Sequence, residues 1–192
     1  MKSKEGKIII FSAPSGTGKS TIIKRLMPAE ELALSFSVSA TSRAPRAGEE
    51  NGRDYYFITP EEFRRHVEAG DFVEWEEVYN GTCYGTLRSE IERIIGEGRN
   101  VVLDIDVMGG LNIKRMYGPR ALALFIEPPS VGALGERLRG RATDSEEVIE
   151  KRLAKAEYEL SFASQYDVTI VNDDLDAAVT AVRDTILNFI KA

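Results

Sequence analysis

The sequence contains almost no cysteine or histidine. Its 192 residues include one of each, Cys83 and His66. A single cysteine cannot form an internal disulfide, so we expect a fold that suits a reducing compartment, with the cytoplasm as the default location.

Long apolar runs and an excess of positive charge are also missing. The longest later run, "ALALFI" at 121–126, is far shorter than the roughly 20 residues of a membrane helix. The apolar run in "MKSKEGKIIIF" is too short for a signal-peptide core, so we expect neither secretion nor membrane insertion. A net charge of −6 argues against nucleic acid as the main partner.

Apolar segments of strand length alternate with helical patterns along most of the chain. The segments are β-rich and nearly all apolar, which is typical of strands covered on both faces. We expect five strands, at 7–12, 35–40, 100–106, 121–127 and 167–171. Helical patterns occupy 109–117, 130–139, 146–165 and 175–190. The sequence therefore predicts an α/β fold, a parallel five-stranded sheet with helices on both faces.

Residues 54–86 interrupt this rhythm. The segments "DYYFI" and "FVEWEEVY" alternate polar and apolar residues around a short helical pattern from Pro60 to Ala69. Thr59 is the expected N-cap of that helix, and Gly70 is its expected end. We interpret the region as a small mixed or antiparallel insertion.

The segment "APSGTGKST" at 13–21 follows an apolar strand and opens an amphipathic helix. In that context it predicts a phosphate-binding P-loop of the pattern G-x-x-x-x-G-K-[ST]. Lys19 adds a positive charge, and Ser20 is the expected Mg²⁺ ligand. Ala13 replaces the first glycine, which is tolerated if its φ is negative, whereas Gly16 and Gly18 are expected to need unusual backbone angles. The alternative is a strand-to-helix connection that binds nothing.

A second candidate site lies in "SVSATSRAPRAGEENGRDYYF". Arg43 and Arg46 stand three residues apart, and two guanidinium groups suit a doubly charged phosphate monoester. A tyrosine hydroxyl could add a neutral donor. A solvated basic turn is the alternative interpretation.

Taken in order, these segments and several later ones resemble guanylate kinases from about residue 7 to the C-terminus. The later segments are "FVEWEEV", "CYGT", "VVLDIDVMGG", "ERLRGRATDSEEVIEKRL" and "IVNDDL". The resemblance implies transfer of the γ-phosphoryl group of ATP to GMP with Mg²⁺, and dGMP should fit as well. It also implies a single domain over 1–192, with a core at 1–34, 87–138 and 160–192, a GMP-binding insertion at about 35–86 and a lid at about 139–159. Monomer and homo-oligomer both stay open.

The resemblance also implies roles for individual residues. Those expected to bind ATP are Ala13, Pro14, Ser15, Gly16, Thr17, Gly18, Lys19, Ser20, Thr21 and Asn172. Those expected to bind GMP are Ser39, Arg43, Arg46, Tyr55, Glu74, Tyr84, Thr86 and Asp106. Catalytic roles fall to Lys19, Arg43 and the lid arginines Arg141 and Arg152. The expected metal contacts are Ser20 and, through water, Asp104.

Several of these roles have a competing explanation. A carboxylate suits guanine, whose N1–H and N2–H₂ are adjacent donors, but Glu74 and Glu76 share a face and spacing does not separate them. Asp106 could instead be a helix N-cap, and Asn172 a turn or cap residue. His66 is not expected to act as a base, because a phosphate acceptor is already anionic.

Two local features depart from the common family pattern. Met108 stands where glutamine is usual, and the turn before Tyr84 is one residue longer than the typical turn. A non-catalytic, guanylate-kinase-like module that binds proteins is the alternative function, and a kinase for another nucleotide is a third. Retention of Lys19 and the lid arginines favours the enzyme.

Overall fold

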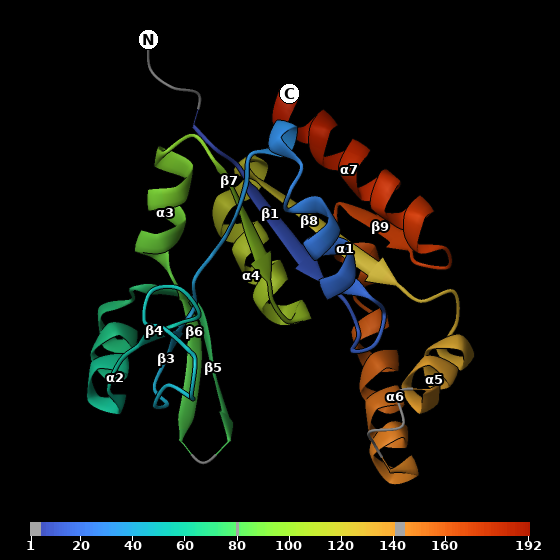
Figure 1. The fold of residues 1–192 in the computed structure, drawn as a ribbon, viewed down its shortest axis with the longest axis horizontal. Coiled ribbons are helices and arrows are strands. Elements are labelled where there is room, and N and C mark those ends of the chain that lie inside the picture. The colour runs from blue at the N-terminus through green and yellow to red at the C-terminus, as the bar shows by residue number, and fades with distance from the viewer. Residues whose placement is uncertain (1–4, 80, 141–144) are drawn as a thin grey trace. The chain divides into compact units, whose positions relative to one another are not determined.

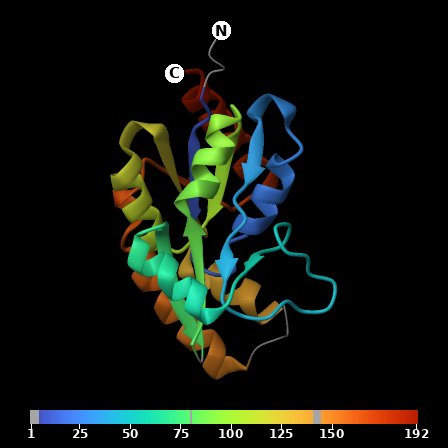
Figure 2. The same cartoon turned by 90° about the vertical axis from the view of Figure 1, so that its left-hand side faces the viewer.

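The computed structural model describes residues 5–79, 81–140 and 145–192. The chain forms two compact units. The small unit comprises residues 1–8 and 35–101, and the large unit comprises 9–34 and 102–192. Figure 1 labels their helices and strands, and Figure 2 gives a second view.

The main sheet has five strands in the order β2-β7-β1-β8-β9. Their bounds are β1 Ile8–Ser12, β2 Leu34–Phe36, β7 Asn100–Asp104, β8 Ala121–Glu127 and β9 Val168–Val171. All of β1 and nearly all of β8 are buried, as expected for strands covered on both faces. The predicted α/β fold with a five-stranded parallel sheet is confirmed.

In the large unit, helices cover both faces of the sheet. The helices are α1 Lys19–Leu26, α4 Val107–Tyr117, α5 Val131–Gly140, α6 Glu146–Leu160 and α7 Leu175–Lys191. Alternation along β8 sends Leu124 and Ile126 into the core with α1 and α7. Ala123 and Phe125 face the other way and pack with the start of α4. This arrangement places the turn between β1 and α1 at the carboxyl end of a buried strand.

The second sheet lies in the small unit and has the order β4-β3-β6-β5. Its strands are β3 Ala40–Thr41, β4 Tyr56–Phe57, β5 Phe72–Tyr79 and β6 Thr82–Leu87. β3 pairs with β4 in parallel and with β6 antiparallel, and β5 and β6 are antiparallel. The sheet is therefore mixed.

The helix α2, Pro60–Ala69, packs against the second sheet (Figures 1 and 2). Thr59 and Glu62 form a reciprocal capping box, and Gly70 ends the helix with a φ of 72°. Both predicted caps are confirmed. Phe63 stacks on Phe72 with ring centroids 4.5 Å apart, which fixes the helix on one face of the sheet.

Several predicted element bounds were wrong. The single strand expected at 35–40 is split between β2 and β3, because the Val38 N–H turns to a Glu90 carboxylate oxygen 3.5 Å away. α4 begins at Val107 rather than residue 109, and α6 ends at Leu160 rather than residue 165. α3, Arg88–Gly96, has no counterpart among the predicted helices.

Candidate active site

The turn between β1 and α1 has the backbone geometry of a phosphate loop. Gly16 and Gly18 have φ values of 95° and 93°, so their predicted need for unusual angles is confirmed. Ala13 is not among the described residues with positive φ, so its methyl group introduces no backbone strain there. The Thr17 hydroxyl donates to the Pro14 carbonyl oxygen at 2.9 Å, which closes the turn on itself.

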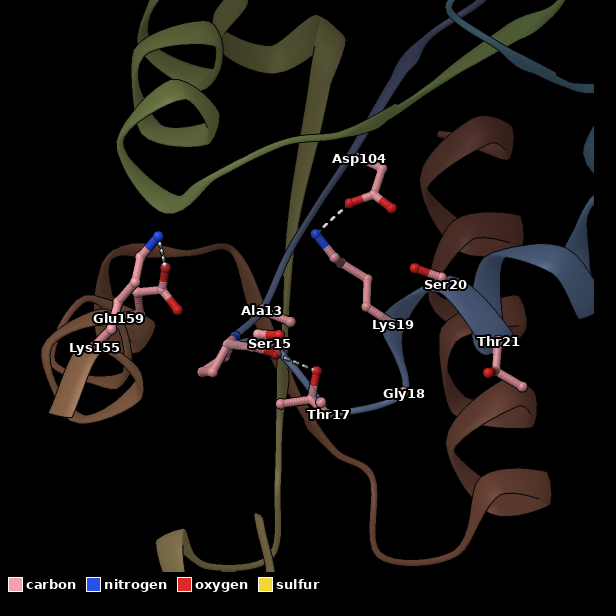
Figure 3. Close-up of a pocket in the computed structure, with 12 residues that line it drawn as sticks. Ala13, Ser15, Thr17, Gly18, Lys19, Ser20, Thr21, Asp104, Lys155 and Glu159 are labelled. Atoms are coloured by element: carbon pink, nitrogen blue, oxygen red, sulfur yellow. Dashed lines mark hydrogen bonds and ion pairs between the residues drawn. The ribbon is translucent and has the colours of Figure 1, made fainter. Parts of the chain in front are cut away.

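The loop lines a cavity of about 390 Å³ in the large unit (Figure 3). Residues 13–21 form one wall of it, and Asp104, Lys155 and Glu159 complete the lining. The first turn of α1 opens into this space, so the positive end of the helix dipole adds to the charge of Lys19. The cavity therefore suits a polyphosphate.

Lys19 and Asp104 form an ion pair inside this cavity (Figure 3). Their side chains are 18% and 25% exposed, so the pair is largely shielded from water. Lys19 comes from the start of α1 and Asp104 from the end of β7. Asp104 thus compensates the charge of Lys19.

Ser20 and Asp104 supply the hydroxyl and carboxylate oxygens of the cavity wall that a hard cation prefers. Among the described residues, no group of three or more His, Cys, Asp or Glu side chains is placed to hold a metal ion. This sparse donor set fits Mg²⁺, which is usually held by one or two protein oxygens together with substrate phosphates and water.

Asp106 lies beyond the end of β7 and is the N-cap of α4. Its Oδ1 accepts hydrogen bonds from the Met108 and Gly109 N–H groups at 2.8 and 3.0 Å. The capping role left open by the sequence is therefore present. A role for Asp106 in guanine binding stays a prediction.

α6 contributes two residues to the cavity that the sequence analysis missed, Lys155 and Glu159. The Glu159 side chain is 12% exposed, and burial raises the pKa of its carboxyl group despite Lys155 at 3.7 Å. No motif marks these positions, because only the packing of α6 brings them to the loop. Arg152 lies one turn before Lys155 on α6, whereas Arg141 lies outside the described residues.

A second cavity of the large unit, about 420 Å³, lies beside the loop. It is lined by Gly16, Thr17, Gly18, Thr21, Arg137, Gly140, Asn172, Asp173 and Leu175. Asn172 thus reaches the predicted ATP site. However, its side chain points into the protein, because the amide Nδ2 donates to the Thr17 carbonyl oxygen at 2.6 Å.

In the small unit, Arg43 is the centre of a cluster of polar and aromatic side chains. Its guanidinium donates two 2.7 Å hydrogen bonds to Glu49, and its Nε donates to the Tyr84 hydroxyl at 3.1 Å. It also lies 5.2 Å from the centre of the Tyr55 ring. The structure therefore brings together three of the predicted phosphate ligands, Arg43, Tyr55 and Tyr84.

Glu49 was not identified from the sequence. The two hydrogen bonds from Arg43, followed by one from the Arg46 backbone N–H, lower the pKa of its carboxyl group to about 2. The Arg46 side chain is exposed. Glu49 therefore compensates the charge of Arg43 within this cluster.

Glu74 and Thr86 form a second pair in the small unit, on neighbouring strands. The Thr86 hydroxyl donates to Glu74 Oε1 at 2.5 Å, and the two residues face each other across β5 and β6. Glu74 is half-buried, whereas Glu76, on the same face, is exposed. Burial therefore distinguishes the two carboxylates that spacing could not separate. Ser39 is half-buried just before β3, and its carbonyl oxygen accepts from the Tyr56 N–H at 2.9 Å.

His66 and Cys83 lie apart from these clusters. His66 is 41% exposed on α2 and contacts the Asp71 carboxylate at 2.8 Å. Cys83 pairs with Glu77 on the β5–β6 face opposite Glu74, and burial raises the pKa of its thiol. A raised pKa disfavours the thiolate, so this environment does not activate Cys83 as a nucleophile.

No helix in the described part of the chain is long and apolar enough to span a bilayer.

Comparison with known proteins identifies the family. The guanylate kinase family model matches residues 5–188. The chain is 58% identical to a guanylate kinase of Porphyromonas gingivalis over 184 residues, covering 96% of this chain and 98% of that protein. It is 55% identical to a guanylate kinase of Bacteroides thetaiotaomicron over 190 residues, covering 99% and 93% of the two chains.

A solved structure agrees with these relatives. The guanylate kinase of Anaplasma phagocytophilum superposes with a TM-score of 0.73 at 32% identity, covering 98% of this chain and 88% of that one. Nothing in the fold or in these comparisons favours the non-catalytic binding module. With a phosphate loop, an arginine–tyrosine cluster and relatives that match along almost their whole length, the chain belongs to the guanylate kinase family.

Proposed function

We propose that, in the transfer of the γ-phosphoryl group from ATP to GMP that this enzyme performs, the large unit binds ATP and the small unit binds GMP. The observation that carries the ATP assignment is the cavity formed by residues 13–21. The positive φ of Gly16 and Gly18 and the position of Lys19 at the start of α1 support it. On ATP binding, Lys19 exchanges Asp104 for phosphate oxygens.

The GMP phosphate is proposed to replace Glu49 at Arg43. A phosphate presents a similar pair of oxygens to the guanidinium and carries more negative charge than a carboxylate. It therefore competes well with Glu49 for the N–H donors of Arg43. The Tyr84 hydroxyl already contacts Arg43 and can turn to donate to the phosphate, with Tyr55 and Arg46 as further contacts. Because this acceptor is anionic, no base has to remove a proton before attack.

Glu74 is proposed to read the base. Its carboxylate can accept from the N1–H and N2–H₂ groups of guanine, while the hydroxyls of Thr86 and Ser39 are further contacts. Adenine would leave the half-buried carboxylate unsatisfied, and mismatches of this kind discriminate by roughly 10⁴-fold. No residue assigned to this site reads the ribose 2′-hydroxyl, so dGMP is an expected substrate.

The hydroxyl of Ser20 and the carboxylate of Asp104, the latter through water, would hold Mg²⁺. When bound, the cation screens the charge of the ATP phosphates. Arg152 and Arg141 are proposed to contribute further positive charge as lid residues, and Asp106 to contact the guanine. A cytoplasmic location is proposed from the single cysteine.

The test is release of ADP from Mg·ATP with GMP, dGMP, AMP, CMP or UMP as the acceptor. We expect turnover with GMP and dGMP and little with the other three. A preference for AMP would overturn the assignment of Glu74. Absence of turnover with every acceptor would overturn the proposed function.

A further inference from the structure

The side chain of Asn172 is buried against the phosphate loop. Asn172 is 5% exposed and follows the last strand of the main sheet, 155 positions after Thr17. Its Nδ2 donates to the Thr17 carbonyl oxygen at 2.6 Å, and Thr17 itself is 1% exposed. A buried carbonyl without a partner is costly, so this hydrogen bond stabilises one conformation of the loop.

The backbone of Asn172 is fixed at both of its polar groups. Its N–H donates to the Glu127 carbonyl oxygen at 2.7 Å, at the end of β8. Its carbonyl oxygen accepts from Arg137 Nη2 on α5 at 2.9 Å. The amide that contacts the loop is therefore held by a strand end and a helix, not by a free surface turn.

Gly18 shows how closely this amide approaches the loop. A Cβ atom at position 18 would lie 2.5 Å from Asn172 Nδ2, which is closer than Cβ atoms come to any neighbour. The φ of Gly18 is also 93°. Glycine is thus required both by the backbone angle and by the space that Asn172 occupies.

The hydrogen bond also orients a phosphate donor. The Thr17 carbonyl and the Gly18 N–H belong to one planar trans peptide group, so they point in opposite directions. With its carbonyl directed at Asn172, this peptide directs the Gly18 N–H away from Asn172. The same peptide leads into Lys19 and the first turn of α1.

We infer that Asn172 is a positioning residue, which holds the peptide between Thr17 and Gly18 in its phosphate-binding orientation. The inference rests on the proposed role of the loop in binding ATP. It adds a positioning role to the adenine contact that the family resemblance implies for this residue. Its consequence is that loss of the Asn172 amide weakens the binding of every polyphosphate, whatever base is attached.

The test uses Asn172→Ala and Asn172→Asp, with Asn188→Ala as the matched control on the exposed face of α7. Both changes at position 172 remove the amide donor. Affinities for ATP, GTP and inorganic tripolyphosphate are measured calorimetrically in the absence of GMP, and the affinity for GMP is measured separately. We expect roughly tenfold weaker binding of all three polyphosphates, unchanged GMP binding, and no effect in the control.

Two outcomes would overturn the inference. One is a loss for ATP that spares GTP and tripolyphosphate, which would make Asn172 an adenine contact. The other is unchanged affinity in both variants. If the wild type binds tripolyphosphate but fails to transfer phosphate to GMP, the proposed function is wrong. The polyphosphate affinities of the variants still test the role of Asn172 in that case.

A measurement on the intact protein covers the case in which the variants do not fold. The side-chain amide protons of Asn172 are compared with those of Asn188 by hydrogen exchange in nuclear magnetic resonance. We expect slow exchange at Asn172 before any nucleotide is added and fast exchange at Asn188. Equally fast exchange at both would overturn the inference.

Discussion

Arg43 and Glu49 form a two-pronged ion pair, in which Nη1 and Nη2 each lie 2.7 Å from a different carboxylate oxygen. Glu49 thereby occupies the place at Arg43 that we assign to the GMP phosphate. Since the Arg46 backbone N–H donates to the same carboxylate, the pair also shapes the loop between β3 and β4. In the proposed exchange, the GMP phosphate takes the place of the Glu49 carboxylate, so the charge of Arg43 stays compensated.

The pair predicts a pH dependence of stability. The pKa of Glu49 falls from its ordinary value of 4.5 to about 2 in the folded protein, so the unfolded chain binds more protons between these values. The stabilisation is fully present above pH 4.5 and is lost as the pH falls towards 2. Urea denaturation measures the free energy of unfolding of the wild type and of Glu49→Gln. The difference between the two should be constant near neutral pH and should shrink as the pH falls towards 2. A difference independent of pH would contradict the ion pair.

Glu74 and Glu76 provide a matched pair for base recognition, since they lie on the same face of β5 and differ in burial. Glu74→Gln should lower kcat/KM for GMP by about 10²-fold or more, because an amide oxygen accepts only one of the two guanine donors and its NH₂ group opposes the other. Glu76→Gln should change it less than about threefold. The two variants are compared at saturating ATP, and equal losses would contradict the assignment.

The environment of Glu159 predicts a pH dependence of stability opposite in sign to that of Glu49. Burial raises the pKa of its carboxyl group above the ordinary 4.5, so the folded protein binds more protons than the unfolded chain just above pH 4.5. The wild type should lose stability relative to Glu159→Gln as the pH rises through this range. Glu157→Gln, an exposed neighbour on α6, is the control and should show no such trend in urea denaturation.

Ala13 can be replaced by the glycine that the P-loop pattern normally has. The φ of Ala13 is not positive, so a change to glycine relieves no backbone strain. Glycine instead increases the conformational entropy of the unfolded chain. Ala13→Gly should keep activity within about threefold and lower the free energy of unfolding by about 0.5–1 kcal/mol. Calorimetric unfolding with a parallel turnover assay checks both. A gain in stability would show that the alanine is strained.

What the sequence could predict depends on how local each signal is. The loop glycines and the caps of α2 follow from neighbouring residues, and Thr59, Gly16 and Gly18 behave as their chemistry requires. Glu49 and Glu159 carried no such signal. Their roles arise from a guanidinium six residues away and from the packing of α6 on the loop.

Asn172 shows the same limit in another form. The family resemblance implied an ATP-binding role for Asn172, and the residue lines a cavity beside the loop. The direction of its amide depends on Thr17, which is distant in sequence, and on the missing side chain at Gly18. The split of the expected strand at 35–40 likewise depends on Glu90 from α3.

The central claim is that ATP binds through the loop of residues 13–21 with Lys19, and that the GMP phosphate binds through Arg43. Calorimetric titration of Lys19→Ala and Arg43→Ala with ATP and with GMP tests it most directly, with Lys24→Ala as the control on the exposed side of α1. We expect Lys19→Ala to weaken ATP binding by about tenfold or more and to leave GMP binding intact, and Arg43→Ala to do the reverse. Loss of both substrates in either folded variant, or GMP binding that survives Arg43→Ala, would contradict the account.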